Sequence, residues 1–311
     1  MKNSKLPTFQ ASFLQPKYWG LWLGIGLWRL LLCLPYPLLV HIGKGLGNLF
    51  ARFKFGQRRL NIARRNLELS FPHLNSFQIG ELLKQHQESI GMAIIETGMA
   101  WFWSDRRIKK WCKIEGAEHL IHHQQRGILL VGIHFLTLEL GARLVGMVQK
   151  GIGVYRPNDN PVFDWLQVHG RMRANKDMLD RHDLRGMIKA LRRGEMIWYA
   201  PDHDYGRRSN VFVPFFGVEE ASTTTGTYYL LRSAPKAAVI PFAPLRNADY
   251  SGYTLKVEAP VDFSDVKDEI NIATKMNKLI EKEILQGIPQ YMWLHRRYKT
   301  RPNEDDPSLY D

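Results

Sequence analysis

The sequence predicts an α/β protein with a mixed central sheet flanked by helices, preceded by an N-terminal membrane-associated helical segment. The first observation is an alternation of short apolar runs with stretches of helical periodicity, which is typical of a sheet with crossover helices. The second is a long apolar run near the N-terminus. We expect strands at residues 127–134, 151–155, 195–200, 237–243 and 252–258, and helices at residues 135–149, 160–173, 183–193, 221–233 and 267–286.

Residues 60–100 are also predicted to be helical, because apolar side chains recur there at the spacing of one helix face. Ser76 is the expected N-cap of the later part of this segment. The sequence contains no internal repeat and no long Pro/Ser-rich linker. We therefore expect a membrane anchor at residues 1–45 and one cytoplasmic domain at residues 46–311, which ends in a flexible charged tail from Lys299.

The anchor is predicted from the run between Tyr18 and Leu34, whose 17 residues include one charged side chain, Arg29. A spanning helix needs about 17–25 residues, and Pro35 would end this one. The length of the run, Arg29 and the lack of a small-x-small site argue against a cleaved signal peptide. The run either spans the bilayer or lies in its plane, and a buried amphipathic helix of a soluble protein is the alternative.

The formal net charge of +13 indicates an anionic partner, such as nucleic acid, an acidic lipid surface or a phosphorylated substrate. Six basic residues lie between positions 52 and 65, with no acidic residue before Glu68. Such a segment stays on the cytoplasmic side and attracts anionic lipid. The chain also has 9 Trp and 15 Phe, and aromatic rings collect at bilayer interfaces. The composition therefore favours a membrane over nucleic acid.

The strongest candidate for chemistry is His134, which ends the strand-like run 127–134 and is followed five residues later by Glu139. Open α/β sheets bind their ligands beyond the carboxyl ends of the strands. Residues five apart lie on different faces of one helix. We therefore expect His134 to cap the strand and Glu139 to begin the next helix, from which its carboxylate reaches the imidazole. That pair would be a base with an orienting acid, which activates a hydroxyl. The alternative is a structural histidine and a solvated glutamate.

Two further strand ends carry polar residues that a cleft over the sheet would need. Arg156 follows the strand at 151–155, and Arg171 and Asn175 come in and after the next helix. Asp202 follows the strand at 195–200. The forked donors of arginine suit phosphate groups, although these arginines are equally well explained as surface charges paired with nearby aspartates.

Several kinds of site are not expected. The three consecutive residues Asp202, His203 and Asp204 cannot all turn toward one ion without a special loop, so we predict no metal. Cys33 and Cys112 stand outside any ligand-spaced cluster, which argues against a disulfide framework or a zinc site. The sequence has no GxSxG elbow, Walker loop or GxGxxG after a strand. A serine hydrolase, an NTPase and a dehydrogenase are therefore disfavoured.

Five blocks in order along the chain resemble the late acyltransferases of lipid A biosynthesis, the lauroyl/myristoyl acyltransferase family. The blocks are Glu96–Trp103, His134–Gly141, Val154–Asn158, Tyr199–Asp204 and Tyr291–Arg297. The second block has the HX4E form of the HX4D/E motif of glycerolipid-type acyltransferases. The likeness runs from about Phe13 to Pro302.

The resemblance implies a glycerolipid-acyltransferase-like fold and an enzyme of the bacterial inner membrane whose catalytic domain faces the cytoplasm. Such an enzyme moves a fatty acyl group from acyl carrier protein to a hydroxyacyl chain of a Kdo-bearing lipid A precursor of the lipid IVA type. The expected partners are therefore acyl carrier protein, the lipid A precursor and anionic membrane lipid, without nucleic acid and without a cofactor beyond the acyl carrier as co-substrate. The alternatives are a glycerolipid acyltransferase of phospholipid synthesis and a non-catalytic membrane protein that binds anionic lipid.

For a lipid A acyltransferase, the resemblance implies that His134 and Glu139 are the catalytic residues. His134 would take the proton of the acceptor hydroxyl, and Glu139 would hold the ring and stabilise the imidazolium. Substrate would be bound by Arg156, Arg171, Asn175 and Asp202, with Arg171 as the first candidate to steady the oxyanion and Arg156 as the second. No acyl-enzyme is expected.

Overall fold

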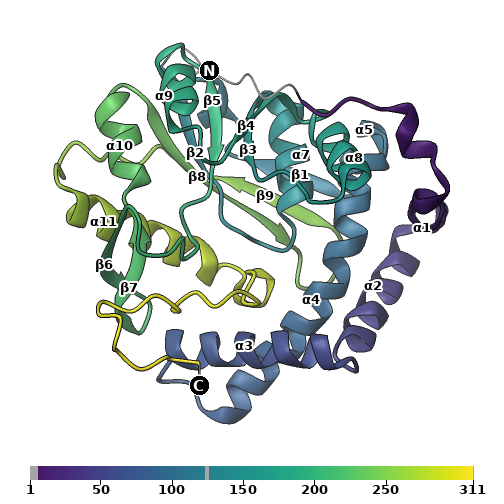
Figure 1. The fold of residues 1–311 in the computed structure, drawn as a ribbon, viewed down its shortest axis with the longest axis horizontal. Helices are drawn as coiled ribbons and strands as arrows, with labels where there is room; N and C mark the ends of the chain where they lie inside the picture. Colours follow the sequence, from purple (N-terminus) through teal and green to yellow (C-terminus); the bar gives the residue numbers. More distant parts are fainter. Residues whose placement is uncertain (1–5, 123–125, 311) are drawn as a thin grey trace.

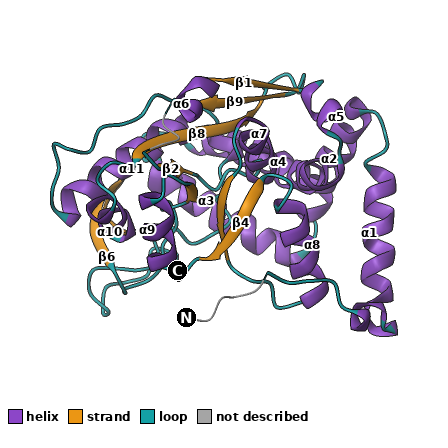
Figure 2. Cartoon of the chain, turned by 90° about the horizontal axis from the view of Figure 1, so that it is seen from above, coloured by secondary structure: helices purple, strands orange, loops and turns teal. Residues whose placement is uncertain are grey.

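The computed structural model describes residues 6–122 and 126–310, and a mixed seven-stranded sheet lies at its centre (Figures 1 and 2). The strand order is β1-β9-β8-β2-β5-β3-β4, and neighbouring strands are parallel except for β8 and β9. The strands of this sheet are β1 (Cys112–Glu115), β2 (Ile128–Val131), β3 (Gly151–Tyr155), β4 (Asn175–Asp180), β5 (Met196–Tyr199), β8 (Ala238–Arg246) and β9 (Tyr253–Val257). A separate antiparallel hairpin consists of β6 (Asn210–Phe215) and β7 (Val218–Thr224).

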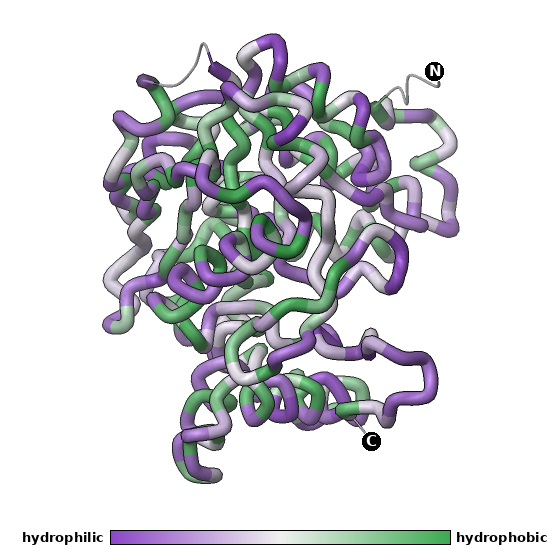
Figure 3. Tube along the Cα trace, turned by 90° about the vertical axis from the view of Figure 1, so that its left-hand side faces the viewer, coloured by the Kyte–Doolittle hydropathy of each residue, from purple (hydrophilic) through white to green (hydrophobic). Residues whose placement is uncertain are grey.

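Helices cover both faces of the sheet (Figure 2). The elements are α1 (Trp19–Leu31), α2 (Tyr36–Phe50), α3 (Lys54–Ser70), α4 (Ser76–Phe102), α5 (Asp105–Lys109), α6 (Ala117–Ile121), α7 (Leu138–Val148), α8 (Pro161–Arg171), α9 (Leu184–Arg192), α10 (Gly226–Ser233) and α11 (Glu269–Leu285), with short 3-10 turns at Ala11–Leu14, Pro16–Tyr18 and Ile288–Gln290. The α4 and α7 helices pack on one face, and α9, α10 and α11 pack on the other. Figure 3 shows hydrophobic residues gathered inside this body and hydrophilic ones along its outer loops.

The β2 strand is buried on both of its faces. Ile128 and Leu130 lie in the core cluster that includes α4 and α7, whereas Leu129 and Val131 point to the clusters that include α9, α10 and α11. A strand with two buried faces reads as an uninterrupted apolar run. The mixed central sheet flanked by helices and the five expected strands are confirmed, whereas membrane association of the N-terminal segment stays a prediction.

The expected helices are also present, with one correction. The helix expected at 221–233 begins only at Gly226, because residues 218–224 form β7 and pair with β6. Four strands were not expected from the sequence: β1, β4, β6 and β7. The edge strand β4 has the sequence NKDMLD and buries one residue, Met178, so it carries no apolar alternation that would reveal it.

The start of α4 differs from the prediction by one residue. Asn75, not Ser76, is the N-cap, and its side chain accepts a hydrogen bond from the Gln78 amide at 3.0 Å. The Gln78 side chain accepts one in return from the Asn75 amide at 2.9 Å. This reciprocal capping box satisfies two amide groups that the helix itself leaves unpaired.

The N-terminal segment forms two helices, and the break between them lies at Pro35 as expected. The α1 helix has 13 residues. Among the residues that the structure describes, no helix is both long enough and apolar enough to cross a membrane. The α2 helix continues past residue 45, where the sequence placed the end of the anchor. It packs closely on α4. The two helices leave no room for a side chain at Gly91, since an added methyl group would lie 2.0 Å from the Gly43 carbonyl oxygen.

The charged tail is docked on the body of the protein, so the expectation that it is flexible was wrong for residues 299–310. The C-terminal end lies beside α3 (Figure 1). Arg65 of α3 donates a hydrogen bond to the Leu309 carbonyl at 2.7 Å, and the Tyr310 hydroxyl donates one to Asn66 Oδ1 at 2.5 Å. Asp311 lies outside the described residues.

Candidate active site

The candidate site lies where the neighbouring parallel strands β2 and β5 end. His134 follows β2 in the loop that leads to α7, and Asp202 follows β5. The Gly132 amide donates a hydrogen bond to the Tyr199 carbonyl at 2.8 Å, which keeps the two chains together just beyond the sheet. The carboxyl edge of a parallel sheet is where such folds bind ligands.

His134 is held by Asp202 through two hydrogen bonds. Its Nδ1 lies 2.7 Å from Asp202 Oδ1, and its backbone amide donates to Oδ2 at 2.9 Å. Asp202 is fully buried, whereas 22% of the His134 side chain is exposed. Because a carboxylate accepts the Nδ1 proton, Nε2 of the neutral ring is left as the basic nitrogen.

The contact with His134 lowers the pKa of the Asp202 carboxyl group. Burial by itself would raise the pKa of the carboxyl group. The charges of His134 and then His203, together with the hydrogen bonds from His134, outweigh burial and hold the pKa well below its usual value. Asp202 is therefore ionised and can stabilise an imidazolium at His134.

Glu139 does not contact His134 as the sequence led us to expect. It lies in the first turn of α7, where its Oε1 accepts a hydrogen bond from Arg171 Nε at 2.9 Å and its Oε2 accepts one from Trp101 Nε1 at 2.9 Å. No hydrogen bond or ion pair joins Glu139 and His134 in the described chain. The expected contact was wrong because α7 presents Glu139 to α4 and α8, while Asp202 occupies the Nδ1 side of the imidazole.

The residues expected to bind substrate fall into separate groups. Arg171 binds Glu139, and Asn175 donates a hydrogen bond to the Arg171 carbonyl at 2.9 Å, so these three residues are together. Asp202 lies at the histidine instead. Arg156 is exposed, with its Nη2 3.9 Å from Asp159 Oδ1, and exposed ion pairs of this kind contribute little to stability.

Two more histidines, which the sequence did not single out as catalytic, lie at this site: His203 stacks on His134, and His295 lies against His203 with its ring tilted. The ring of His203 is 3.7 Å from that of His134 with an interplanar angle of 13°, and His295 is 4.8 Å from His203. Burial and then the charge of His134 hold the pKa of His203 well below its usual value. The signal that could have revealed His203 is its position next to Asp202 at a strand end.

The distances alone would allow a metal ion at His134, Asp202 and His203, whose candidate ligand atoms lie within 4.8 Å of one another. The stacking argues against that use. Ring nitrogens bind metals through lone pairs in the ring plane, and two nearly parallel rings direct those lone pairs side by side rather than toward one point.

A narrow apolar cavity of about 30 Å³ lies next to Glu139 and Arg171, between α7 and strands β2 to β5. Its walls are mostly apolar: Leu130, Leu138, Ala142, Val145, Val154, Ala174, Met178, Met196 and Trp198. A space of this size holds roughly one or two water molecules. Two of the lining side chains are methionines, which are flexible and adapt to a neighbour's shape.

Two basic residues contribute positive charge at the histidine cluster. The pKa of His295 is lowered by burial, then by the charge of His134 and then by that of Arg59; the charge of Asp202 acts in the opposite direction, and Lys299 adds a smaller lowering. Arg59 Nη1 also donates a hydrogen bond to the Leu294 carbonyl at 3.3 Å. The fold therefore brings a basic residue of the 52–65 segment and one of the C-terminal segment to the same place.

Comparison with known proteins extends over nearly the whole chain. Residues 6–300 match the family model described as bacterial lipid A biosynthesis acyltransferase. The chain is 65% identical to a lipid A biosynthesis acyltransferase of Haemophilus influenzae, over 100% of both chains. It is 55% identical to the lipid A biosynthesis lauroyltransferase of Escherichia coli over 99% of this chain and 100% of the relative, and 45% identical to the palmitoleoyltransferase of that organism over 97% and 98%.

Proposed function

Since the chain belongs to the bacterial lipid A biosynthesis acyltransferase family and is an acyltransferase, we propose that it transfers a fatty acyl group from acyl carrier protein to a hydroxyl on an acyl chain of a Kdo-bearing lipid A precursor. One observation carries the mechanism: the hydrogen bond from His134 Nδ1 to the buried Asp202 leaves Nε2 as a base on a partly exposed ring. This is the arrangement that activates a hydroxyl.

In the proposed reaction, His134 Nε2 accepts the proton of the acceptor hydroxyl while its oxygen attacks the thioester carbonyl carbon. The C–S bond then breaks, and the imidazolium returns the proton to the departing thiolate. Asp202 holds the ring in the required tautomer and stabilises the imidazolium. General-base help of this kind contributes about 10²–10⁴-fold to the rate. The step needs no acyl-enzyme.

We assign Glu139 a role different from that of the orienting acid. Glu139 accepts a hydrogen bond from Trp101 and fixes Arg171 at the edge of the apolar cavity. The Nη1 atom of Arg171 makes no hydrogen bond within the described chain, so it is available to a substrate oxygen. Arg171 therefore remains our candidate for steadying a developing oxyanion.

The apolar cavity is the proposed entry for the donor's acyl chain. The cavity is polar at Glu139 and Arg171 and apolar along its other walls. This distribution suits a group with a polar head and a hydrocarbon tail. The chain would displace Met178 and Met196, since the free volume is too small for it. Each buried methylene would contribute about 0.8 kcal/mol.

The outer face of α1 supports membrane association in the plane of the bilayer. Trp19, Leu23, Leu27 and Leu30 recur at helical spacing and are all more than half exposed. Figures 1 and 2 place α1 at the edge of the molecule. At the start of α3, the exposed Phe53 and Phe55 alternate with the basic residues Arg52 and Lys54. Aromatic and basic side chains in this combination bind an anionic lipid surface. We therefore propose that the enzyme lies on the inner membrane, with its catalytic body in the cytoplasm.

The test is a mass-spectrometric assay of the purified protein with a lipid IVA-type precursor and a panel of acyl carrier proteins charged with different chains. We expect a single added acyl group with the wild-type protein and none with His134→Ala, whose folding is checked by circular dichroism. Near-normal transfer by folded His134→Ala would reject the assignment of the base. Transfer to glycerol phosphate but not to the precursor would identify a phospholipid enzyme instead.

A further inference from the structure

We propose that Gln290 is a positioning residue for His134, acting through the segment Ile288–Trp293. The inference rests on the proposed function, because it concerns the pose of the proposed base. His134 lies in an irregular loop between β2 and α7, where its backbone has no strand or helix of its own to align it. Its alignment must therefore come from other parts of the chain.

The partners of this loop come from the segment that follows α11. The Met292 amide donates a hydrogen bond to the His134 carbonyl at 2.8 Å, and the Leu136 amide donates one to the Gln290 carbonyl at 2.7 Å. Phe135 and Tyr291 form an antiparallel bridge between these two bonds. The segment thus pairs with the histidine loop like a short extra strand.

The same segment also contacts the other half of the proposed catalytic pair. The buried Tyr291 hydroxyl donates a hydrogen bond to the Asp202 carbonyl at 3.3 Å. One short stretch of chain is therefore bonded to the backbone of both His134 and Asp202. A shift of this stretch would change the position of the imidazole relative to a bound hydroxyl.

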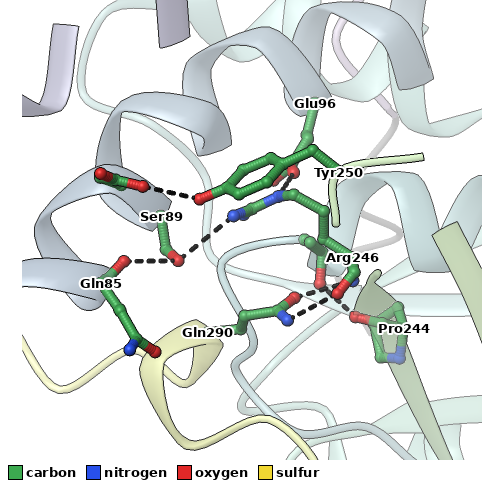
Figure 4. Close-up of polar contacts among 9 residues, drawn as sticks. Gln85, Ser89, Glu96, Pro244, Arg246, Tyr250 and Gln290 are labelled. Carbon is green, nitrogen blue, oxygen red and sulfur yellow. Dashed lines mark hydrogen bonds and ion pairs between the residues drawn. The ribbon is translucent and has the colours of Figure 1, made fainter. Parts of the chain in front are cut away.

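Gln290 fixes the segment to the sheet. Its Oε1 accepts a hydrogen bond from the Arg246 amide at 2.8 Å, and its Nε2 donates one to the Arg246 carbonyl at 2.9 Å (Figure 4). Arg246 ends β8 and is itself immobilised by a buried ion pair with Glu96 of α4, 2.7 Å from Nε to Oε1. The Gln290 side chain thus links a buried polar network to the histidine loop.

The amide side chain of Gln290 can be removed without a large change in volume. Gln290→Met loses both hydrogen bonds to Arg246, and Gln290→Glu keeps the acceptor but loses the donor. Because a displacement of about 1 Å can cost about 10²-fold in rate, we expect kcat to fall about 10–100-fold in Gln290→Met and by less in Gln290→Glu. KM should change less than twofold in both, since Gln290 does not line the apolar cavity.

Gln286→Met is the matched control. Gln286 is the C-cap residue that follows α11, and its side chain bonds to Glu283 rather than to the histidine loop. All variants are compared by kcat, KM, thermal unfolding and the proton NMR signal of the His134 Nδ1–H group that faces Asp202. We expect that signal to shift or broaden in Gln290→Met and to stay unchanged in Gln286→Met.

A wild-type kcat and an unchanged NMR signal in folded Gln290→Met would overturn the inference. So would an equal loss of kcat in Gln286→Met, because the effect would then be general destabilisation. If His134→Ala is inactive while Gln290→Met is normal, the positioning role fails and the proposed function stands. If His134→Ala is active, the proposed function fails first.

Discussion

The Nδ1 atom of His134 lies 2.7 Å from Oδ1 of Asp202, although 68 positions separate the two residues in the sequence. They meet because β2 and β5 are neighbouring parallel strands that end side by side. Glu139, only five positions after His134, binds Arg171 and Trp101 instead. The carboxylate that orients the histidine is therefore supplied by the sheet topology and not by the local motif.

Asp202→Asn should lower kcat by about 10²–10⁴-fold, because an amide cannot stabilise the imidazolium and favours the wrong ring tautomer. Glu139→Gln provides the comparison, since it removes the charge partner of Arg171 and leaves the His134–Asp202 pair intact. We expect a smaller loss from Glu139→Gln and no change in the pH dependence of kcat. The opposite ranking in a pH series of the transfer assay would make Glu139 the orienting acid.

Arg59→Glu should raise the KM for the lipid precursor several-fold while the protein stays folded. The reason is that Arg59 and Lys299 supply positive charge beside His295, where phosphate or carboxylate groups of the acceptor would lie. Added salt should raise the wild-type KM in the same direction. Arg185→Glu, an equal charge change on the exposed side of α9, serves as control. Equal KM values for Arg59→Glu and wild type would exclude this anion-binding role.

Gly153→Ala should shift the preferred donor toward shorter acyl chains. The added methyl group would lie 2.6 Å from Met178 Sδ, so Met178 must move within the apolar cavity and reduce its free space. The measurement is the ratio of transfer rates for donors that differ by two carbons. Gly80→Ala is the control, since its methyl group would meet nothing within 4 Å. An unchanged ratio in folded Gly153→Ala would mean that the acyl chain lies elsewhere.

The double variant Leu23→Glu with Leu27→Glu should weaken binding to vesicles that contain anionic phospholipid by at least 10-fold, because two exposed apolar side chains of α1 would become charged. Flotation with vesicles measures this binding. Ile270→Glu changes a similarly exposed apolar residue on α11 and should have no effect. If both proteins float like wild type, α1 is not the membrane-binding face.

The buried His86 should make stability depend on pH between about 6.5 and 4. Burial lowers its pKa from 6.5 to about 4, although its hydrogen bond to the Pro289 carbonyl acts in the opposite direction. In that window the unfolded chain binds the proton and the folded chain does not, so the free energy of unfolding falls as the pH falls, by on the order of 3 kcal/mol.

His86→Gln keeps a donor for Pro289 and removes the titration, so its stability should be less sensitive to pH than that of the wild type. The exposed His73→Gln should leave the wild-type dependence unchanged. Denaturant unfolding at pH 4.5, 5.5 and 6.5 gives the comparison. Parallel curves for wild type and His86→Gln would contradict a neutral buried His86.

Much of the fold could be predicted because burial leaves a periodic trace in the sequence. The β2 strand is buried on both faces and reads as Ile-Leu-Leu-Val, and Pro35 marks the break between α1 and α2. The strands β4 and β7 left no such trace, since strands that are partly solvated tolerate polar residues. The β6 strand is apolar but contains Pro214, which argues against a strand in a sequence-based prediction. The α1 helix has 13 residues, fewer than the 17-residue apolar run from which a membrane anchor was predicted.

The sequence by itself determined the fold class, the strand ends at which polar side chains gather, His134 as the leading candidate base and the resemblance to lipid A acyltransferases. These properties could be predicted because they depend on short segments and on their order along the chain, and not on which segments become neighbours in space. Only the tertiary structure decided that Asp202 holds His134, that Glu139 holds Arg171 and that residues 288–293 align the histidine loop. Such contacts depend on which strands become neighbours and on the direction in which the first turn of α7 faces, and neither is encoded in the spacing of a motif.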